Sequence, residues 1–121
     1  MNLEMLHEFM LTMPGTVEER PFTPEVPVYK VMGKMFAYVS PNKQPPWLTL
    51  KLDPAMGRLV RSTHRSVLPG YHMNKEHWNT IILDGSIAEG EILAWIEESY
   101  DLVVAGLTRK KKAELRRLTT K

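Results

Sequence analysis

The chain has 121 residues, of which 43% are hydrophobic, and this is enough for one compact domain with a single core. It contains no cysteine, which excludes disulfides, thiolate metal sites and cysteine nucleophiles. No apolar run approaches the ~20 residues of a membrane span, and the first residues lack the pattern of a signal peptide. We therefore expect a cytoplasmic protein without membrane contact.

The formal net charge of +2 conceals blocks of opposite sign. Residues 20–75 hold nine Lys and Arg against two acids, and residues 76–107 hold seven acids with no Lys or Arg. Residues 108–121 hold seven Lys and Arg against one acid. Such blocks either neutralise each other within the fold or form separate faces, one of which would attract polyanions.

The first part of the chain predicts one helix followed by a β-meander. Apolar residues at three- and four-residue spacing favour a helix over residues 2–12, which Pro14 and Gly15 end. Three prolines between residues 16 and 27 predict an irregular segment. The pattern of apolar residues predicts strands, the first two joined by a short turn at Gly33, over residues 28–31, 35–39 and 47–52.

A second helix is expected to begin at Asp53, whose carboxylate can accept from the free N–H groups of the first turn. Pro54 suits the first helical position, and the helix is expected to end at about Thr63. The stripe predicted to face the core comprises Met56, Leu59, Val60 and Thr63. The three arginines of this segment fall outside that stripe, and we expect them to point to water.

Two further strands are predicted in the middle of the chain. Pro69 cannot donate to a strand ladder, so residues 66–70 are a connector or a short edge strand. The consecutive apolar residues at 79–83 are typical of a central, covered strand.

A long helix is predicted over residues 87–106, with Ser86 as the N-cap of a capping box. The acids of this helix lie outside its apolar stripe and indicate a solvated face. Beyond it, residues 108–121 predict a short basic helix or tail anchored by Leu115 and Leu118.

The order of these elements predicts an α+β fold, in which an antiparallel β-sheet is packed by helices on one face. We expect residues 1–107 to form a single domain. Residues 108–121 then follow as the basic C-terminal helix or tail.

The densest group of polar and aromatic side chains is the stretch Pro69-Gly70-Tyr71-His72-Met73-Asn74-Lys75-Glu76-His77-Trp78-Asn79-Thr80. This stretch resembles the MmcQ/YjbR-like family. The hairpin at residues 30–37, the junction at 50–54, the turn at 83–86 and the segment at 99–103 follow in family order. The resemblance covers about residues 1–107. It implies a frataxin-like, double-wing α+β domain and a DNA-binding function, and it carries over no catalytic residue.

The histidines and acids form no recognisable catalytic or metal-binding pattern. His72 and His77 are five residues apart, whereas a helical metal-binding pair is spaced by four. No nucleophile elbow or glycine-rich phosphate loop occurs. We therefore expect no enzyme activity, bound metal or cofactor, and a metal- or small-ligand-binding domain stays open as an alternative.

Nucleic-acid binding requires cations that meet phosphates and polar or aromatic groups that meet bases. The basic excess between residues 20 and 75 favours DNA as the partner, bound largely without sequence preference. The predicted contacts are Lys30, Lys34, Lys43, Arg58, Arg61, Arg65, Tyr71, His72, Asn74 and Lys75. Trp78 precedes the apolar strand and is expected in the core. A protein-interaction or regulatory module without nucleic acid is the other alternative, because Met, Tyr and Trp suit a protein partner.

Overall fold

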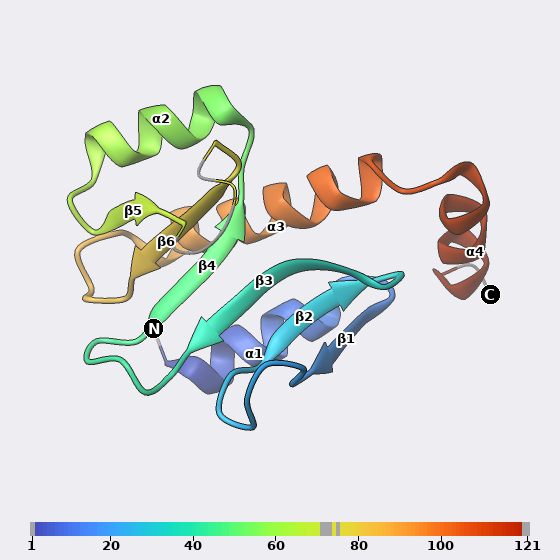
Figure 1. The fold of residues 1–121 in the computed structure, drawn as a ribbon, viewed down its shortest axis with the longest axis horizontal. Helices are drawn as coiled ribbons and strands as arrows, with labels where there is room; N and C mark the ends of the chain where they lie inside the picture. Colours follow the sequence, from blue (N-terminus) through green and yellow to red (C-terminus); the bar gives the residue numbers. More distant parts are fainter. Residues whose placement is uncertain (1, 71–73, 75, 120–121) are drawn as a thin grey trace.

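The computed structural model describes residues 2–70, 74 and 76–119, and it consists of a six-stranded antiparallel sheet and four helices (Figure 1). The strands are β1 (Thr16–Glu19), β2 (Val28–Val31), β3 (Lys34–Ser40), β4 (Trp47–Lys51), β5 (Val67–Pro69) and β6 (Trp78–Ile82). Their order in the sheet is β1-β2-β3-β4-β6-β5. The helices are α1 (Leu3–Thr12), α2 (Pro54–Thr63), α3 (Glu89–Ala105) and α4 (Arg109–Thr119). The predicted α+β class is confirmed.

Helices α1, α2 and α3 pack on the same face of the sheet. On this face Leu48 lies opposite Ile81, and Leu50 lies opposite Asn79. The apolar residues among these belong to the buried core that the helices complete. Successive strand residues point to opposite faces, so Thr49 and Thr80 lie on the other face. Figure 1 is seen from that other face, with α1 and α3 behind the sheet.

Two strands at the centre of the sheet separate along their length. β3 and β4 pair from Ser40 opposite Trp47 up to Ala37 opposite Leu50, and no further pair is formed beyond that point. A β-bulge displaces the β2–β3 register at the same level. Figure 1 shows α3 in the opening between the two strands. A bulge bends its strand and increases local twist, which accounts for the separation.

Ser99 of α3 satisfies the backbone groups that the separation leaves without a strand partner. Its hydroxyl donates to the carbonyl of Phe36 at 2.6 Å. The same hydroxyl oxygen accepts from the N–H of Lys51 at 2.8 Å. Ser99 is fully buried, and a buried backbone group without a partner would be costly. One side chain therefore bridges β3 and β4 where direct pairing ends.

The inner stripe of α2 differs from the predicted one. Gly57 and Val60 are the buried residues, whereas Leu59 is 59% exposed. A Cβ at Gly57 would lie 3.2 Å from Oδ1 of buried Asn79, so a residue without a side chain allows the helix to approach the sheet closely. Arg61 also turns inward and donates to the Asn79 amide oxygen. The prediction that Arg61 points to water is wrong, because Asn79 needs a polar partner.

Two predictions at the ends of elements are also wrong. Residues 16–19 form the edge strand β1, although the proline-rich segment was expected to be irregular. The prolines follow β1 and leave its four residues free to pair with β2. The N-cap of α3 is Ala88 without a side-chain bond. Ser86 instead donates through its hydroxyl and its N–H to Asp84 Oδ1, and these bonds lower the pKa of Asp84.

The basic segment after α3 forms the regular helix α4, which extends at the end of the sheet where the β2–β3 turn lies (Figure 1). Leu115 is buried, as predicted, and lies against Gly15. Leu118 is 68% exposed, so its predicted role as an anchor is wrong. The two leucines are three residues apart, and only one of them reaches the sheet.

We expect replacement of Ser99 by Ala to destabilise the fold by about 1–3 kcal/mol, because the Phe36 carbonyl and the Lys51 amide would each lose a buried partner. Urea unfolding followed by circular dichroism measures the change. Ser62→Ala is the matched control, since the Ser62 hydroxyl bonds only to an exposed helical carbonyl. Equal stability of the two variants would contradict the bridging role of Ser99.

Candidate nucleic-acid interface

The sheet face that carries Thr49 and Thr80 has no described helix over it (Figure 1). It carries aromatic, hydroxylic and basic side chains, together with apolar ones such as Val28 and Ile82 and the acid Glu19. The two threonines are 1% and 2% exposed, and their hydroxyl oxygens are 3.0 Å apart. Around them lie the half-buried side chains of Tyr38, Trp47 and Trp78. The face therefore presents aromatic rings around a satisfied polar centre.

One end of this face combines rings with a cation. Lys43 Nζ lies 4.8 Å from the centroid of the Trp47 ring, within the range of a cation–π contact. Phe22 packs edge-on against Tyr38, with ring centroids 6.3 Å apart, and is itself 62% exposed. These rings are accessible to a ligand that stacks or carries negative charge.

The other end of the face contains a cleft of about 380 Å³ where β3 and β4 separate. Lys34 and Met35 of β3 form one side, and Lys51 and Trp78 form the other. The last turns of α3 line the cleft with Leu102, Val103 and Gly106. The described lining thus holds two lysines and no acid.

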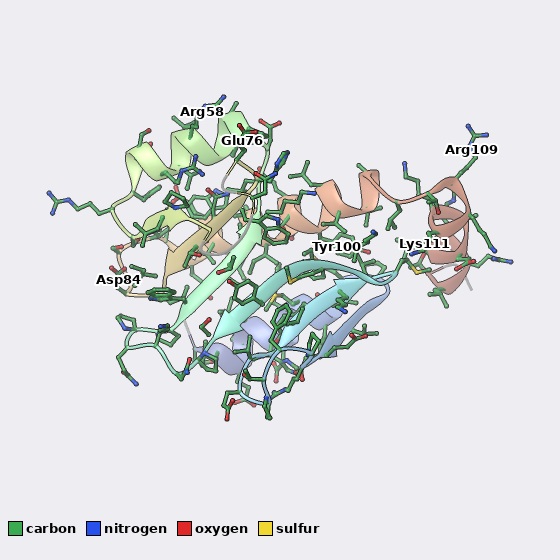
Figure 2. All side chains as sticks on the ribbon, viewed as in Figure 1. Arg58, Glu76, Asp84, Tyr100, Arg109 and Lys111 are labelled. Atoms are coloured by element: carbon green, nitrogen blue, oxygen red, sulfur yellow. The ribbon has the colours of Figure 1, made fainter. Side chains whose placement is uncertain are left out.

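A third lysine lies beside the β2–β3 turn, which adjoins this cleft. The turn has positive φ at Met32 and Gly33, a backbone conformation that matches the twist of a two-residue hairpin. Lys111 of α4 donates from Nζ to the Met32 carbonyl at 3.3 Å, and Figure 2 shows its side chain beside the hairpin tip. Helix α4 therefore adds positive charge at the end of the sheet that holds Lys34.

Not all of the predicted contact residues lie on one face. Lys34 lies opposite Val31, whose side chain belongs to the core, so it borders the cleft from the helix-packed side of the sheet. Lys43 lies over the Trp47 ring, at the other end of the uncovered face. Lys30 also lies on this face, where it forms an ion pair with Glu19 at 3.0 Å. Arg58 and Arg65 are exposed, but α2 lies on the helix-packed side of the sheet, and Figure 2 shows Arg58 pointing away from the strands.

The remaining predicted residues lie in the stretch before β6. Asn74 is exposed, and its side-chain oxygen accepts from the N–H of Glu76 at 2.9 Å. Its carbonyl accepts from the N–H of Trp78, so Asn74 shapes the turn into β6. The predictions at Tyr71, His72 and Lys75 fall outside the described residues.

Four residues of the uncovered face were missed at the sequence level: Tyr38, Trp47, Lys51 and Trp78. Trp78 was expected in the core, but it is half-buried and lies on the face opposite the helices. The sequence did contain a signal for this face: Trp47, Thr49 and Lys51 alternate with apolar residues along β4. Trp78 and Thr80 follow the same alternation along β6. A period of two places such residues on one face, separate from the apolar residues between them.

Two other cavities in the described part of the chain have acidic linings. A groove of about 410 Å³ between α2 and α3 is bordered by Asp53, Glu98 and Asp101. Repulsion by these carboxylates makes the groove unsuitable for phosphates. The groove and the basic cleft both contact Leu102, which separates an acidic surface from a basic one.

The third cavity, of about 300 Å³, contains a hydrogen-bonded group of titratable side chains. His7 Nδ1 lies 2.9 Å from the Tyr29 hydroxyl and 3.2 Å from Glu18 Oε2. Arg20 donates to the other oxygen of Glu18 at 3.0 Å. Burial, together with the negative charge of Glu18, raises the pKa of Tyr29 to about 12. Because Glu18 already engages both His7 and Arg20, we regard this group as structural.

No group of three or more His, Asp or Glu residues with the geometry of a metal site occurs in the described part of the chain. The ring of His64 packs against that of Trp95, with centroids 5.5 Å apart, and its Nε2 lies 3.7 Å from Glu91 Oε2. None of the described helices is long and apolar enough to cross a bilayer.

The antiparallel sheet with its helices on one face defines a small α+β domain, and similarity to other proteins identifies its family. The YjbR family model matches residues 11–102, and the chain belongs to this family. It is 35% identical to YbdF of Escherichia coli O157:H7 over 120 residues, which cover 96% of this chain and 98% of YbdF. It is 30% identical to YjbR of Escherichia coli K12 over 112 residues, covering 93% and 95% of the two chains.

Two solved structures are similar to this fold. The crystal structure of the Deinococcus radiodurans protein DR2400, a DUF419 domain, superposes with a TM-score of 0.88 and 34% identity, covering 94% of this chain and 87% of that one. A crystal structure of a Pseudomonas syringae protein superposes with a TM-score of 0.73 and 27% identity, covering 84% and 98% of the two chains. The arrangement of sheet and helices is thus shared with members of known structure.

We expect the Tyr29 hydroxyl to make stability depend on pH in the alkaline range. Its pKa is about 12 in the fold and 10.0 ordinarily, so the folded state holds the proton more tightly. The resulting stabilisation is complete below pH 10.0 and is lost as pH rises through about 12. Urea unfolding across this range measures it.

Tyr29→Phe removes the titrating group, so the variant should lack this part of the alkaline decrease in unfolding free energy. The lysines are common to both proteins, and their contribution cancels in the comparison. Parallel pH profiles for the two proteins would show that burial does not shift the Tyr29 pKa.

Proposed function

We propose that this protein binds DNA without catalysis, through lysines on the uncovered sheet face and around the cleft at its end, which contact the phosphate backbone. The observation that carries this proposal is the presence of Lys34 and Lys51 in one cleft beside the half-buried ring of Trp78, with Lys111 at the adjoining β2–β3 turn. Lys43 extends the positive charge to the far end of the face. Neutralised phosphates release counterions, and such contacts supply affinity without reading sequence.

The distribution of acidic residues also supports the sheet face as the DNA-binding surface. The acidic residues Glu98 and Asp101 line the groove between α2 and α3, on the helix-packed side of the fold. A polyanion is repelled there and attracted to the sheet. The acids of α3 are thus concentrated away from the cleft that holds Lys34 and Lys51.

A duplex titration at several salt concentrations tests the proposal. We expect affinity to fall steeply with salt, and replacing Lys34 and Lys51 by Gln to reduce the slope of log affinity against log salt by about two, or about one per lost phosphate contact. Fluorescence anisotropy of a labelled duplex measures both quantities.

Arg58→Gln with Arg65→Gln is the matched control, because it removes the same charge from α2 and the turn that follows it, on the other side of the sheet. A larger loss in this control would move the interface to α2. Absence of binding at low salt would exclude the DNA-binding function and leave a protein partner for the exposed rings.

A further inference from the structure

We propose that the cleft between β3 and β4 receives one unpaired base of a single DNA strand, so that the protein prefers single-stranded to duplex DNA. This inference rests on the DNA-binding function proposed above. Phosphate binding alone does not require a cleft, and the inference gives this cleft the role of holding a base. Four features of the described residues support it: size, lining, charge and position.

The size of the cleft suits one nucleotide. Its volume of about 380 Å³ lies near the lower limit of the roughly 300–1,000 Å³ of small-molecule sites. Its described lining comes from strands on both sides and from the end of α3 with the following Gly106. A base pair within a stacked helix is too wide to enter such an opening, whereas a single splayed base can enter.

The lining combines a stacking surface with apolar contacts. Trp78 offers an aromatic face on one side, and Met35 offers a polarisable thioether on the other. Leu102 and Val103 complete the apolar lining. Every base has a π-face, so stacking on Trp78 would be tolerant of sequence.

The charge of the cleft suits the phosphates on either side of that base. Lys34 and Lys51 come from opposite sides of the opening. No acidic residue is among the described residues that line it. Lys111 lies next to the same hairpin and can meet a further phosphate. A nucleotide with its base inserted would thus place its backbone between cations.

The position of the cleft provides a path for the rest of the strand. From Lys51 the uncovered face continues along β4 to Trp47, which is four residues away, or about 13 Å in an extended strand. Trp47 carries the Lys43 ammonium over its ring. A second base can stack on Trp47. Between the two stacking sites lie Thr49 and Thr80, whose hydroxyl groups bond to each other.

A duplex cannot use the cleft without first unstacking and unpairing a base, and this costs a few kcal/mol. A single strand has no such cost. The same lysines therefore serve both forms of DNA, and Trp78 contributes only to the single-stranded form. This difference separates the inference from the general DNA-binding function.

The test compares one labelled oligonucleotide of mixed sequence, alone and annealed to its complement, by fluorescence anisotropy at fixed salt. We expect the single strand to bind about tenfold more tightly than the duplex. Trp78→Leu should weaken single-strand binding about tenfold and so remove most of that preference. Trp78→Phe retains an aromatic face and should preserve the preference.

A second variant keeps the test valid if Trp78→Leu does not fold. Met35→Glu places a carboxylate on the opposite side of the cleft without changing Trp78, and we expect it to weaken single-strand binding at least tenfold. Circular dichroism and urea unfolding confirm that each variant is folded.

The outcomes distinguish the two proposals. Duplex binding without a single-strand preference, or a preference that survives Trp78→Leu and Met35→Glu, would overturn the base-binding cleft and leave the DNA-binding function intact. No binding of either form at low salt would overturn both. A preference that is lost in Trp78→Leu and retained in Trp78→Phe would establish the cleft as a base site.

Discussion

The hydroxyl of Ser99 links the central strands of the sheet where they stop pairing with each other. It donates to the Phe36 carbonyl and accepts from the Lys51 amide, so two buried backbone groups that would otherwise lack partners are satisfied by one side chain of α3. This contact lets β3 and β4 diverge without an energetic penalty from unpaired groups. It also holds the end of α3 beneath the opening, which makes the opening a cleft with an apolar lining.

The consequence is a molecule with two chemically distinct sides. One side of the sheet carries the helices, the apolar core and the acidic groove beside α3. The other carries half-buried rings, two hydrogen-bonded threonines and lysines at both ends. Because phosphates are attracted to one surface and repelled by the other, electrostatics orients the proposed DNA on the sheet before any close contact forms.

Much of the fold could be predicted, because local signals and tertiary packing agree in most elements. Asp53 accepts from the N–H of Ala55 at the start of α2, as an N-cap followed by proline predicts. The central position of β6, between β4 and β5, follows from its apolar run. The predictions failed where a side chain bonds to a partner other than the one that periodicity or capping rules assign. Arg61 turns inward toward Asn79, and Ser86 binds Asp84 in place of capping α3.

The sequence by itself determined the class of fold, the order of the elements and the family, since periodicity, capping residues and turn residues are properties of neighbouring positions. It also determined that the chain carries blocks of opposite charge. Only the tertiary structure decided which charges share a surface. Lys34, Lys51, Trp78 and Lys111 are far apart in the chain, and they meet because strand register, the bulge in the β2–β3 pair and the docking of α4 bring them to one end of the sheet.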